Sequence, residues 1–213
     1  MNGAGKRFFN LTLNNTGGGT NDDLVLSGNL NLSGALTVTL GNIDLATNDA
    51  VLSVSDGTIS LADAAQATLT TDANVSHSGA LTVNYNAGFA LTGGTWTNVG
   101  ANDATYTING PAKRFFNVTL NNTGGGTNDD IVFAGSGVNL SGALTVTLGN
   151  MDLATNDQAL IIDDGSITIA DAAQATFTTD VNVTPSGALT VNTNGGFAPT
   201  GGTWTQNGAN DAT

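Results

Sequence analysis

The chain repeats itself, and this internal repetition restricts its fold more than any other feature of the sequence. The string Ser-Gly-Ala-Leu-Thr-Val occurs four times, beginning at residues 33, 78, 141 and 186. Within two long copies, Phe9 returns as Phe116 and Trp96 returns as Trp204, the offset growing by one where a residue is inserted near Gly137. Such self-similarity is typical of repeat proteins, whose units pack on their neighbours. It divides the sequence into one unit at 2–108 and a second at 109–213.

Shorter spacings inside the unit indicate a smaller structural step. Ser33 and Ser78 are 45 residues apart, and Ser78 and Ser141 are 63 apart. These distances equal two and three steps of about 21–22 residues, and the whole period equals about five such steps. The spacing predicts one continuous parallel β-solenoid of about ten coils, with one coil per step.

Composition and alternation both indicate an all-β chain. All 17 acidic residues are Asp, Lys and Arg together number four, and Gly, Asn, Thr, Asp and Ser are abundant. Strong polar helix formers are therefore nearly missing, while Thr and Val favour strands and Gly and Asn favour turns. Alternation in Phe9–Leu13 and Leu36–Leu40 places the apolar residues on one face, and about thirteen strand-like segments per unit are recognisable.

The two copies provide a test of which positions face the core. Apolar residues replace one another at Leu11/Val118, Leu24/Ile131, Ile43/Met151, Leu61/Ile169 and Leu69/Phe177, as a packed core tolerates. Freer changes at Ala50/Gln158, Ser53/Ile161 and Tyr85/Thr193 predict outward positions.

The alternative fold is a pair of tandem immunoglobulin-like β-sandwiches, because the unit 2–108 is as long as one such domain, which has roughly 100 residues. An immunoglobulin-like domain has roughly seven to nine strands, fewer than the strand-like segments of one unit. Such a domain also does not explain the 45-residue sub-repeat. The solenoid is therefore the favoured prediction.

The charge of the chain excludes some classes of partner. A net charge of −13 argues against binding to nucleic acids or to anionic membrane surfaces, because a protein binds either of them through a basic surface. The sequence contains no apolar run of the ~20 residues that a membrane span requires. Divalent cations and neutral glycans remain compatible with such a surface.

The sequence contains few residues that could carry out catalysis, and we expect no enzyme activity. His77 is the only histidine and its counterpart is Pro185, so an exposed turn residue is the prediction for His77. Glu and Cys are absent, which leaves few members for zinc sites or for nucleophile–base pairs. The basic pairs Lys6-Arg7 and Lys113-Arg114 lie at unit boundaries, where pairing with nearby Asp explains them.

Aspartates supply the remaining candidate site. Asp22 and Asp23 follow a Gly-rich turn and recur as Asp129 and Asp130. Calcium binds such carboxylates, but Asp also caps turns through backbone N–H groups, and turn capping is the favoured interpretation. The four residues are therefore weak calcium candidates, and no other cofactor is expected.

Two surface ligands remain open. Segments such as Thr37-Val38-Thr39 are typical of the flat threonine arrays that bind ice, but the threonine spacings do not match multiples of the coil step, which argues against register. Trp96 and Trp204 would favour glycan stacking if exposed, whereas alternation with threonine predicts that both lie in the core.

The phrases FFNLTLNNTGG (8–18), LSGNLNLSGALTV (26–38) and TGGTWTNVGANDATYT (92–107) resemble repeats of very large bacterial surface and secreted proteins. They are similar in style to the β-helices of filamentous haemagglutinins and autotransporter passengers. The resemblance implies a right-handed parallel β-helix and an extracellular or cell-surface location. It also implies a role as a stalk, spacer or filament segment of an adhesin-type protein.

We accordingly expect a non-catalytic structural repeat module, with a binding module for glycan, calcium or ice as the alternative. Met1 stands where another repeat would end and residue 213 stops within the second unit, so we expect a segment of a longer array. Its expected partners are neighbouring repeats of the same chain, with weak head-to-tail self-association between exposed end coils.

Overall fold

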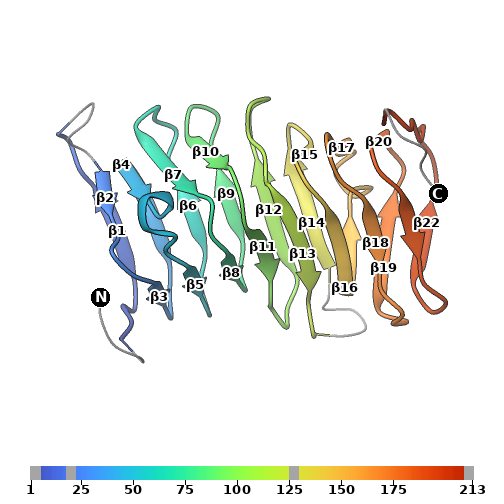
Figure 1. Ribbon diagram of the computed structural model, residues 1–213, viewed down its shortest axis with the longest axis horizontal. Coiled ribbons are helices and arrows are strands. Elements are labelled where there is room, and N and C mark those ends of the chain that lie inside the picture. The colour runs from blue at the N-terminus through green and yellow to red at the C-terminus, as the bar shows by residue number, and fades with distance from the viewer. Residues whose placement is uncertain (1–5, 18–22, 125–129, 209–213) are drawn as a thin grey trace.

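The protein is a rod of stacked β-strands wound as a parallel β-solenoid. The computed structural model describes residues 6–17, 23–124 and 130–208. Strands succeed one another along the long axis from the N-terminal to the C-terminal end (Figure 1). Every strand pairing among the described residues is parallel, and pairs such as β11–β13 and β12–β14 join the two repeat units. The predicted solenoid is thus confirmed, and the tandem sandwiches are wrong because they need antiparallel sheets.

Each coil contributes one segment to each of three faces, which we call face 1, face 2 and face 3. Face 1 contains β1 (Leu11–Asn14), the first half of β4 (Leu36–Asp44), β6 (Ile59–Leu61), β9 (Leu81–Val83), β12 (Ala104–Ile108), β14 (Asp130–Gly135), the second half of β16 (Leu144–Asp152), β19 (Ala175–Thr179) and β22 (Gly196–Pro199). Face 2 contains β3 (Leu30–Leu32), β5 (Leu52–Val54), β8 (Val75–His77), β11 (Thr95–Asn98), β13 (Asn117–Asn121), the first half of β16, β18 (Ile167–Ile169) and β21 (Leu189–Val191). Face 3 contains β2 (Asp23–Val25), the second half of β4, β7 (Ala67–Thr71), β10 (Gly88–Leu91), β15 (Val138–Leu140), β17 (Leu160–Ile162) and β20 (Val183–Pro185).

The coils are longer and less uniform than the predicted step. The number of residues between paired positions varies from coil to coil. The separation between Ala104 and its partner Ile131 is seven residues longer than that between Asp130 and its partner Asn150. The pairing of β1 and of β13 with the next strand also shifts by one residue. Among the described residues nine segments therefore stack on face 1, joined by eight turns of the solenoid, where the sequence predicts about ten coils, since bulges and corner turns absorb the extra residues.

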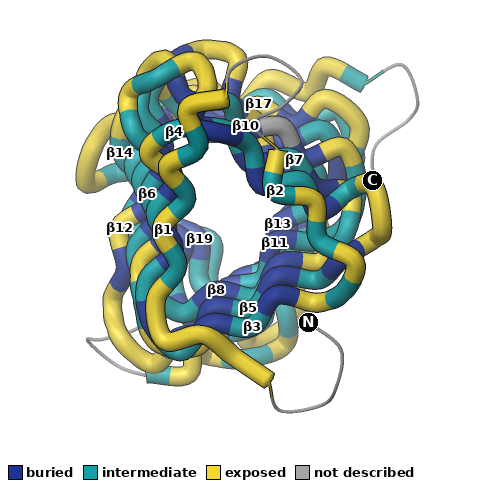
Figure 2. Tube along the Cα trace, turned by 90° about the vertical axis from the view of Figure 1, so that its left-hand side faces the viewer, coloured by how far each residue is buried: buried dark blue, intermediate teal, exposed yellow. Residues whose placement is uncertain are grey.

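A single apolar core runs along the axis of the rod. The view down the rod shows buried residues on the inner side of the coil and exposed residues on the outer side (Figure 2). The predicted inward residues Ile43, Leu61 and Leu69 and their counterparts are fully buried. Leu11 and Leu24 are only half-buried because they belong to the first coil, on which no preceding described coil packs.

Two predictions of side-chain direction are wrong. Phe9 is 73% exposed, because Phe8 forms the bridge to Leu32 on face 2 and the chain turns a corner at Phe9 before β1 begins on face 1. Ala50 and its counterpart Gln158 are buried, although the change between copies predicts exposure.

The exchange of Ala50 for Gln158 follows from the residue inserted in the second unit. Gly137 lies in that insertion, and its backbone N–H donates to Oε1 of Gln158 at 2.8 Å. The longer side chain thus provides the acceptor that the longer turn requires, since a buried amide without a partner is costly. The replacement of Ala50 by Gln158 is therefore explained by a buried hydrogen bond and not by exposure to solvent.

The repeat unit does not contain a whole number of coils. The described residues between Phe8 and Ile108 form twelve strands. With β4 counted on both of its faces and the Phe8 bridge added, they make 14 segments. At three segments per coil, one unit spans 4⅔ coils. Equivalent residues consequently lie on different faces: β1 is on face 1 and its copy β13 is on face 2, while Trp96 is on face 2 and Trp204 bridges to face 3.

Glycines allow close stacking at the corner between faces 2 and 1. A Cβ atom on Gly57 would lie 2.3 Å from the carbonyl carbon of Gly34, and one on Gly79 would lie 2.2 Å from the oxygen of Gly57. In the second unit Gly142, Gly165 and Gly187 stack in the same way, but at the corner between faces 3 and 2. Each corner is therefore a backbone-on-backbone contact that side chains would separate.

We predict that Gly57→Ala destabilises the rod by about 1–3 kcal/mol, because the added methyl group must push two coils apart. Chemical denaturation would measure the loss. Asp56→Ala, a change at an exposed residue of the same turn, is the matched control and should stay within about 0.5 kcal/mol of the parent chain. Equal stability of the two variants would contradict the proposed contact.

Candidate functional site

The four aspartates predicted as weak calcium candidates are not brought together by the described structure. Asp22 and Asp129 lie outside the described residues. Asp23 begins β2 on face 3 and Asp130 begins β14 on face 1. Within residues 6–17, 23–124 and 130–208, no group of three His, Cys, Asp or Glu side chains is placed to hold a metal ion. Calcium binding by these residues stays a prediction.

Asp130 borders a surface cavity whose polar groups bond to one another. The cavity has a volume of about 370 Å³, and Asn150 is one of the residues that line it. Asn150 donates to Asp130 at 3.0 Å and accepts from the hydroxyls of Thr176 and Thr178 at 2.8 and 3.0 Å. In the first unit, Asn42 accepts from Thr68 and Thr70 in the same way, so this group bonds neighbouring coils together in both copies.

Other aspartates cap a corner turn, which is the role that the sequence predicts for this residue type. The carboxylate of Asp44 accepts from the backbone N–H of Thr47 at 3.0 Å and from its hydroxyl at 2.5 Å, just before the 3₁₀ turn η2 (Ala46–Asn48). These bonds lower the pKa of Asp44. Asp152 makes the same bonds to Thr155 in the second unit.

The basic residues at the start of the second unit have structural contacts. Arg114 forms an ion pair with Asp163 at 2.7 Å, which confirms the expected pairing with a nearby aspartate. About half of each side chain is exposed, so this bond adds at most about 1 kcal/mol. Lys113 is 9% exposed, and its aliphatic stem passes Gly110.

His77 lies in the core, and the prediction of an exposed turn residue is wrong. It occupies an inward position of β8, where Pro185 is also buried in the second unit. Nε2 of His77 is 3.1 Å from the oxygen of Gly57, and Nδ1 is 3.5 Å from the hydroxyl of Tyr106. That hydroxyl also accepts from Trp96 at 3.3 Å and from Asn98 at 3.4 Å.

Aromatic rings surround this polar cluster at the junction between the units. Trp96 contacts Phe89, Tyr106 and Phe115 with ring-centroid distances of 5.7, 6.4 and 5.6 Å, all edge to face. The prediction that Trp96 belongs to the core is confirmed, whereas Trp204 is 36% exposed at the C-terminal end. The sequence offered one signal for this layer, namely the concentration of aromatic residues between 89 and 116.

Burial determines the protonation of the cluster. Desolvation lowers the pKa of His77 to about 4, against a smaller opposing effect of the bond to Gly57. Desolvation also raises the pKa of Tyr106. Both groups are therefore neutral at pH 7, with the Nε2 proton of His77 directed at the Gly57 oxygen. A dry, uncharged site of this kind packs the core and presents no group to solvent.

Hydroxyl side chains form ladders on the outside of the rod, and the prediction that the threonines are out of register is wrong. On face 2, five threonines pair directly in successive coils, Thr97, Thr119, Thr145, Thr168 and Thr190, and Ser76 and Ser53 continue the ladder beyond Thr97. On face 1 the ladder contains Thr12, Thr37, Ser60, Thr82 and Thr107. Uneven coil lengths bring these residues together, which a constant step along the sequence did not allow.

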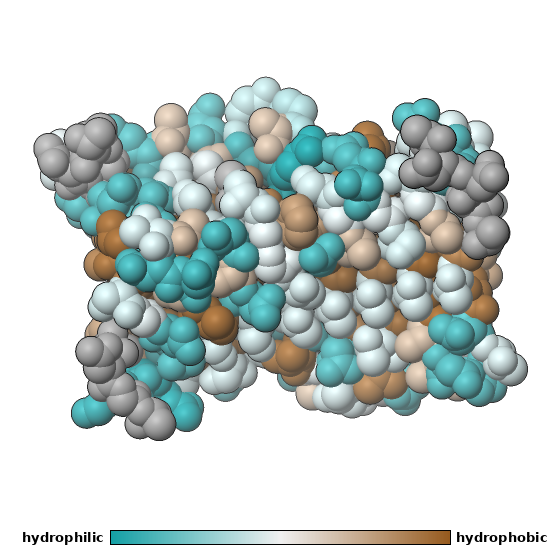
Figure 3. Space-filling model, in the orientation of Figure 1, coloured by the Kyte–Doolittle hydropathy of each residue, from teal (hydrophilic) through white to brown (hydrophobic). Residues whose placement is uncertain are grey.

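The two ladders differ in length. At a spacing of ~4.8 Å, the five coils of the face 1 ladder span about 20 Å between the first and last hydroxyls, and the seven coils of the face 2 ladder span about 29 Å. The face 1 ladder belongs to the first unit, whereas the face 2 ladder runs from the first unit into the second. Pale, near-neutral residues cover much of the right half of the surface in Figure 3, as expected for threonine-rich strands.

Comparisons with family models, with curated proteins and with solved structures find no match to this chain. Among the described residues, none of the helical segments has the length and apolar character that crossing a bilayer demands. The fold itself places the protein among the parallel β-solenoids, and its sequence is built from tandem repeats.

We predict that His77 makes stability depend on pH. In the unfolded chain its pKa is 6.5, and in the folded chain it is about 4. Protons therefore bind the unfolded state preferentially, so the stabilisation is fully present above pH 6.5 and is lost as the pH falls towards 4, by roughly 3 kcal/mol in total. Denaturation midpoints between pH 7 and 4.5 would measure this loss.

His77→Phe, which fills the site without titrating, is the control for this measurement. Its stability should change little over the same pH range, because the phenylalanine side chain does not titrate. The same steep loss of stability in both chains would show that other groups cause the pH dependence.

Proposed function

We propose that the protein is a rigid structural module, a stalk, spacer or filament segment of a large bacterial surface or secreted protein of the adhesin type. One observation carries the proposal: the core and the strand ladders run through the junction of the two units without interruption. β11 pairs with β13 and β12 pairs with β14 across this junction, where Trp96 and Tyr106 are fully buried. Such a chain lengthens without a hinge when units are added.

The polar chemistry of the surface supports the same function. The hydrogen-bonded groups at Asn42 and Asn150 occur once in each unit and hold neighbouring coils together. The net charge of −13 keeps such rods soluble and apart from one another. The extracellular location belongs to this proposal and rests on the resemblance of the repeats to those of surface and secreted proteins.

We predict that each added unit lengthens the rod by about 22 Å, since 4⅔ coils rise ~4.8 Å each. The chain that tests this carries a further copy of residues 2–108 between residues 108 and 109, so that one new junction is the native one and the other has Ala4-Gly5 in place of Pro111-Ala112 in its linker. Small-angle X-ray scattering would compare its maximum dimension and cross-section with those of the parent chain.

A constant cross-section with the stated increase in length is expected of a stiff spacer. A larger increase, with the scattering of flexibly linked bodies, would contradict the proposal. A control chain with only residues 30–51 duplicated after residue 51 adds one coil and should lengthen the rod by about 5 Å.

A second candidate function rests on the threonine ladder of face 2. Regularly spaced hydroxyls at ~4.8 Å present a flat array to an ordered ligand such as ice or a polysaccharide chain. Thr97, Thr119 and Thr145 are each partly exposed and flanked by short strands of the same face. With Ser53 and Ser76 the array has seven rungs, about 29 Å from end to end, and it is one residue wide, which limits it to a small contact area.

If the ladder binds ice, the protein slows ice recrystallisation and Thr145→Tyr abolishes the effect, because a bulky ring at the middle threonine breaks the flat array. Thr105→Tyr, which changes an exposed threonine of face 1 outside both ladders, is the matched control and should retain activity. Splat assays at equal protein concentration would measure crystal size. An inert parent chain would exclude this candidate.

A further inference from the structure

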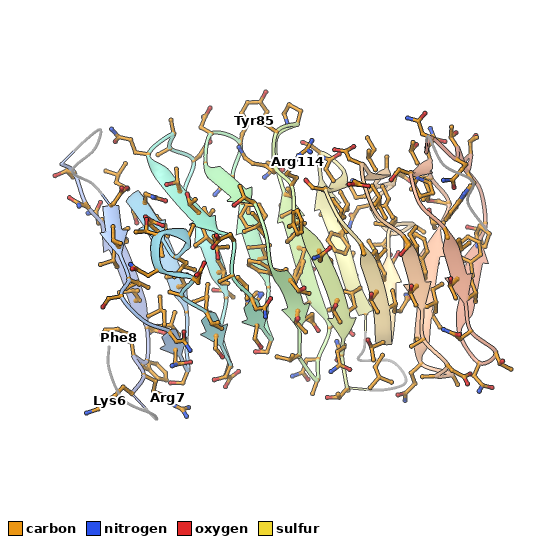
Figure 4. The ribbon with its side chains drawn as sticks, viewed as in Figure 1. Lys6, Arg7, Phe8, Tyr85 and Arg114 are labelled. Atoms are coloured by element: carbon orange, nitrogen blue, oxygen red, sulfur yellow. The ribbon has the colours of Figure 1, made fainter. Side chains whose placement is uncertain are left out.

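The two ends of the described rod expose residues of the core. At the C-terminal end, Leu189, Phe197 and Trp204 line an apolar surface cavity of about 230 Å³. At the N-terminal end, Phe8 is 42% exposed and Leu11 is half-buried. Figure 4 places Phe8 on the outermost coil at this end, beside Lys6 and Arg7.

The middle of the same chain shows these two surfaces joined. Phe89 and Trp96, the counterparts of Phe197 and Trp204, are 3% and 1% exposed. Phe115, the counterpart of Phe8, covers them at ring-centroid distances of 5.1 and 5.6 Å and is itself 1% exposed. Phe115 thus occupies the site that is open at the C-terminal end.

Backbone and polar contacts complete this internal joint. β13 pairs with β11 with Val118 opposite Trp96 and Thr119 opposite Thr97. The side-chain amide of Asn117 donates to the oxygen of Gly94 at 3.1 Å. The same residue types stand at both ends of the rod: Asn10, Leu11 and Thr12 in and before β1, and Gly202, Trp204 and Thr205 in the last coil.

The C-terminal coil is already shaped for this contact. Phe197 and Trp204 lie edge to face at 5.6 Å, as Phe89 and Trp96 do at 5.7 Å. Gly202 has a φ of 73°, close to the 67° of Gly94, so its carbonyl group leaves the turn in a comparable backbone conformation. Little rearrangement is therefore needed before an edge strand can pair here.

We propose that the C-terminal end of one copy of this chain binds the N-terminal end of a second copy, reproducing the contact of β11 with Phe115 and β13 in the joint between its own units. The second copy adds β1 to the segment around Trp204, with Leu11 opposite Trp204 and Thr12 opposite Thr205. Phe8 enters the apolar cavity and covers Phe197 and Trp204, and Asn10 donates to the oxygen of Gly202. The proposal rests on the fold and does not depend on the spacer function.

Charge favours this head-to-tail direction over contact of like ends. Lys6 and Arg7 lie at the N-terminal end, whereas residues 115–213 contain nine aspartates and no lysine or arginine. Residues 1–32 of one copy, whose two cations balance two aspartates, therefore meet the acidic half of the other, whereas two C-terminal ends would bring like charges together. The joint buries one exposed strand edge on each partner, which otherwise remains open to pairing.

Sedimentation of the complete chain between about 5 µM and 1 mM tests the association, a range that covers weak contacts of this size. The expected result is a mass that rises with concentration together with a rising frictional ratio, as rods joined end to end require. Phe8→Asp should weaken the association at least about tenfold, because a carboxylate cannot enter the apolar cavity. Phe9→Asp, at the adjacent 73% exposed position, should leave it unchanged.

Disulfide trapping tests the register, because the chain has no native cysteine. Thr12→Cys and Thr205→Cys chains, mixed and oxidised, should form a mixed dimer, since directly paired strands place Cα atoms about 5 Å apart, within reach of a disulfide. Thr82→Cys, at the middle of face 1, is the control and should not cross-link to Thr205→Cys. A monomer at 1 mM, equal effects of the two Phe variants, or equal cross-linking at residues 12 and 82 would each overturn the proposal.

Discussion

Each coil of this rod is stable only because another coil covers it. The inward residues of one coil lie against those of the next at the strand spacing of ~4.8 Å, and the backbone groups of each strand bond to both neighbours. The effect is visible in the two copies of one residue: Phe115, with coils on both sides, is 1% exposed, whereas Phe8 in the first coil is 42% exposed. In-register stacking is thus the constraint from which the core, the glycine corners and the open ends all follow.

The length of the repeat unit determines what such stacking can display. One unit spans 4⅔ coils, so three units, or 14 coils, pass before an equivalent residue returns to the same face. A ligand site carried by every unit would therefore wind around the rod. This arrangement suits a spacer or a filament with contacts in several directions, and it is a poor design for one long, flat binding face.

The sequence predicts the alternation, the all-β class and the solenoid, because these depend on the local pattern of Leu, Val and Thr. It fails where a corner or a bulge changes the spacing. Asp49 takes a left-handed φ of 49° after the η2 turn and brings Ala50 into the core, which no period-two pattern anticipates. A bulge between Leu120 and Asn121 likewise alters the coil length, and with it the register of the threonine ladder.

The buried polar cluster illustrates a different limit of sequence-based reasoning. A histidine replaced by proline in the other copy indicates a position without a specific function, and that inference says nothing about burial. His77 lies inside because its strand position does, and the core accepts it because the Gly57 oxygen and the Tyr106 hydroxyl satisfy both ring nitrogens.

The aromatic layer explains how near-identical units can join without a specialised connector. The residues that close one unit, Phe89 and Trp96, and the residue that opens the next, Phe115, form a single edge-to-face cluster. Large rings fill the space between coils of unequal length, where Val or Leu would leave voids that cost stability. Every unit carries both halves of this joint, so the contact that stabilises the junction between units is also the contact that allows the rod to grow.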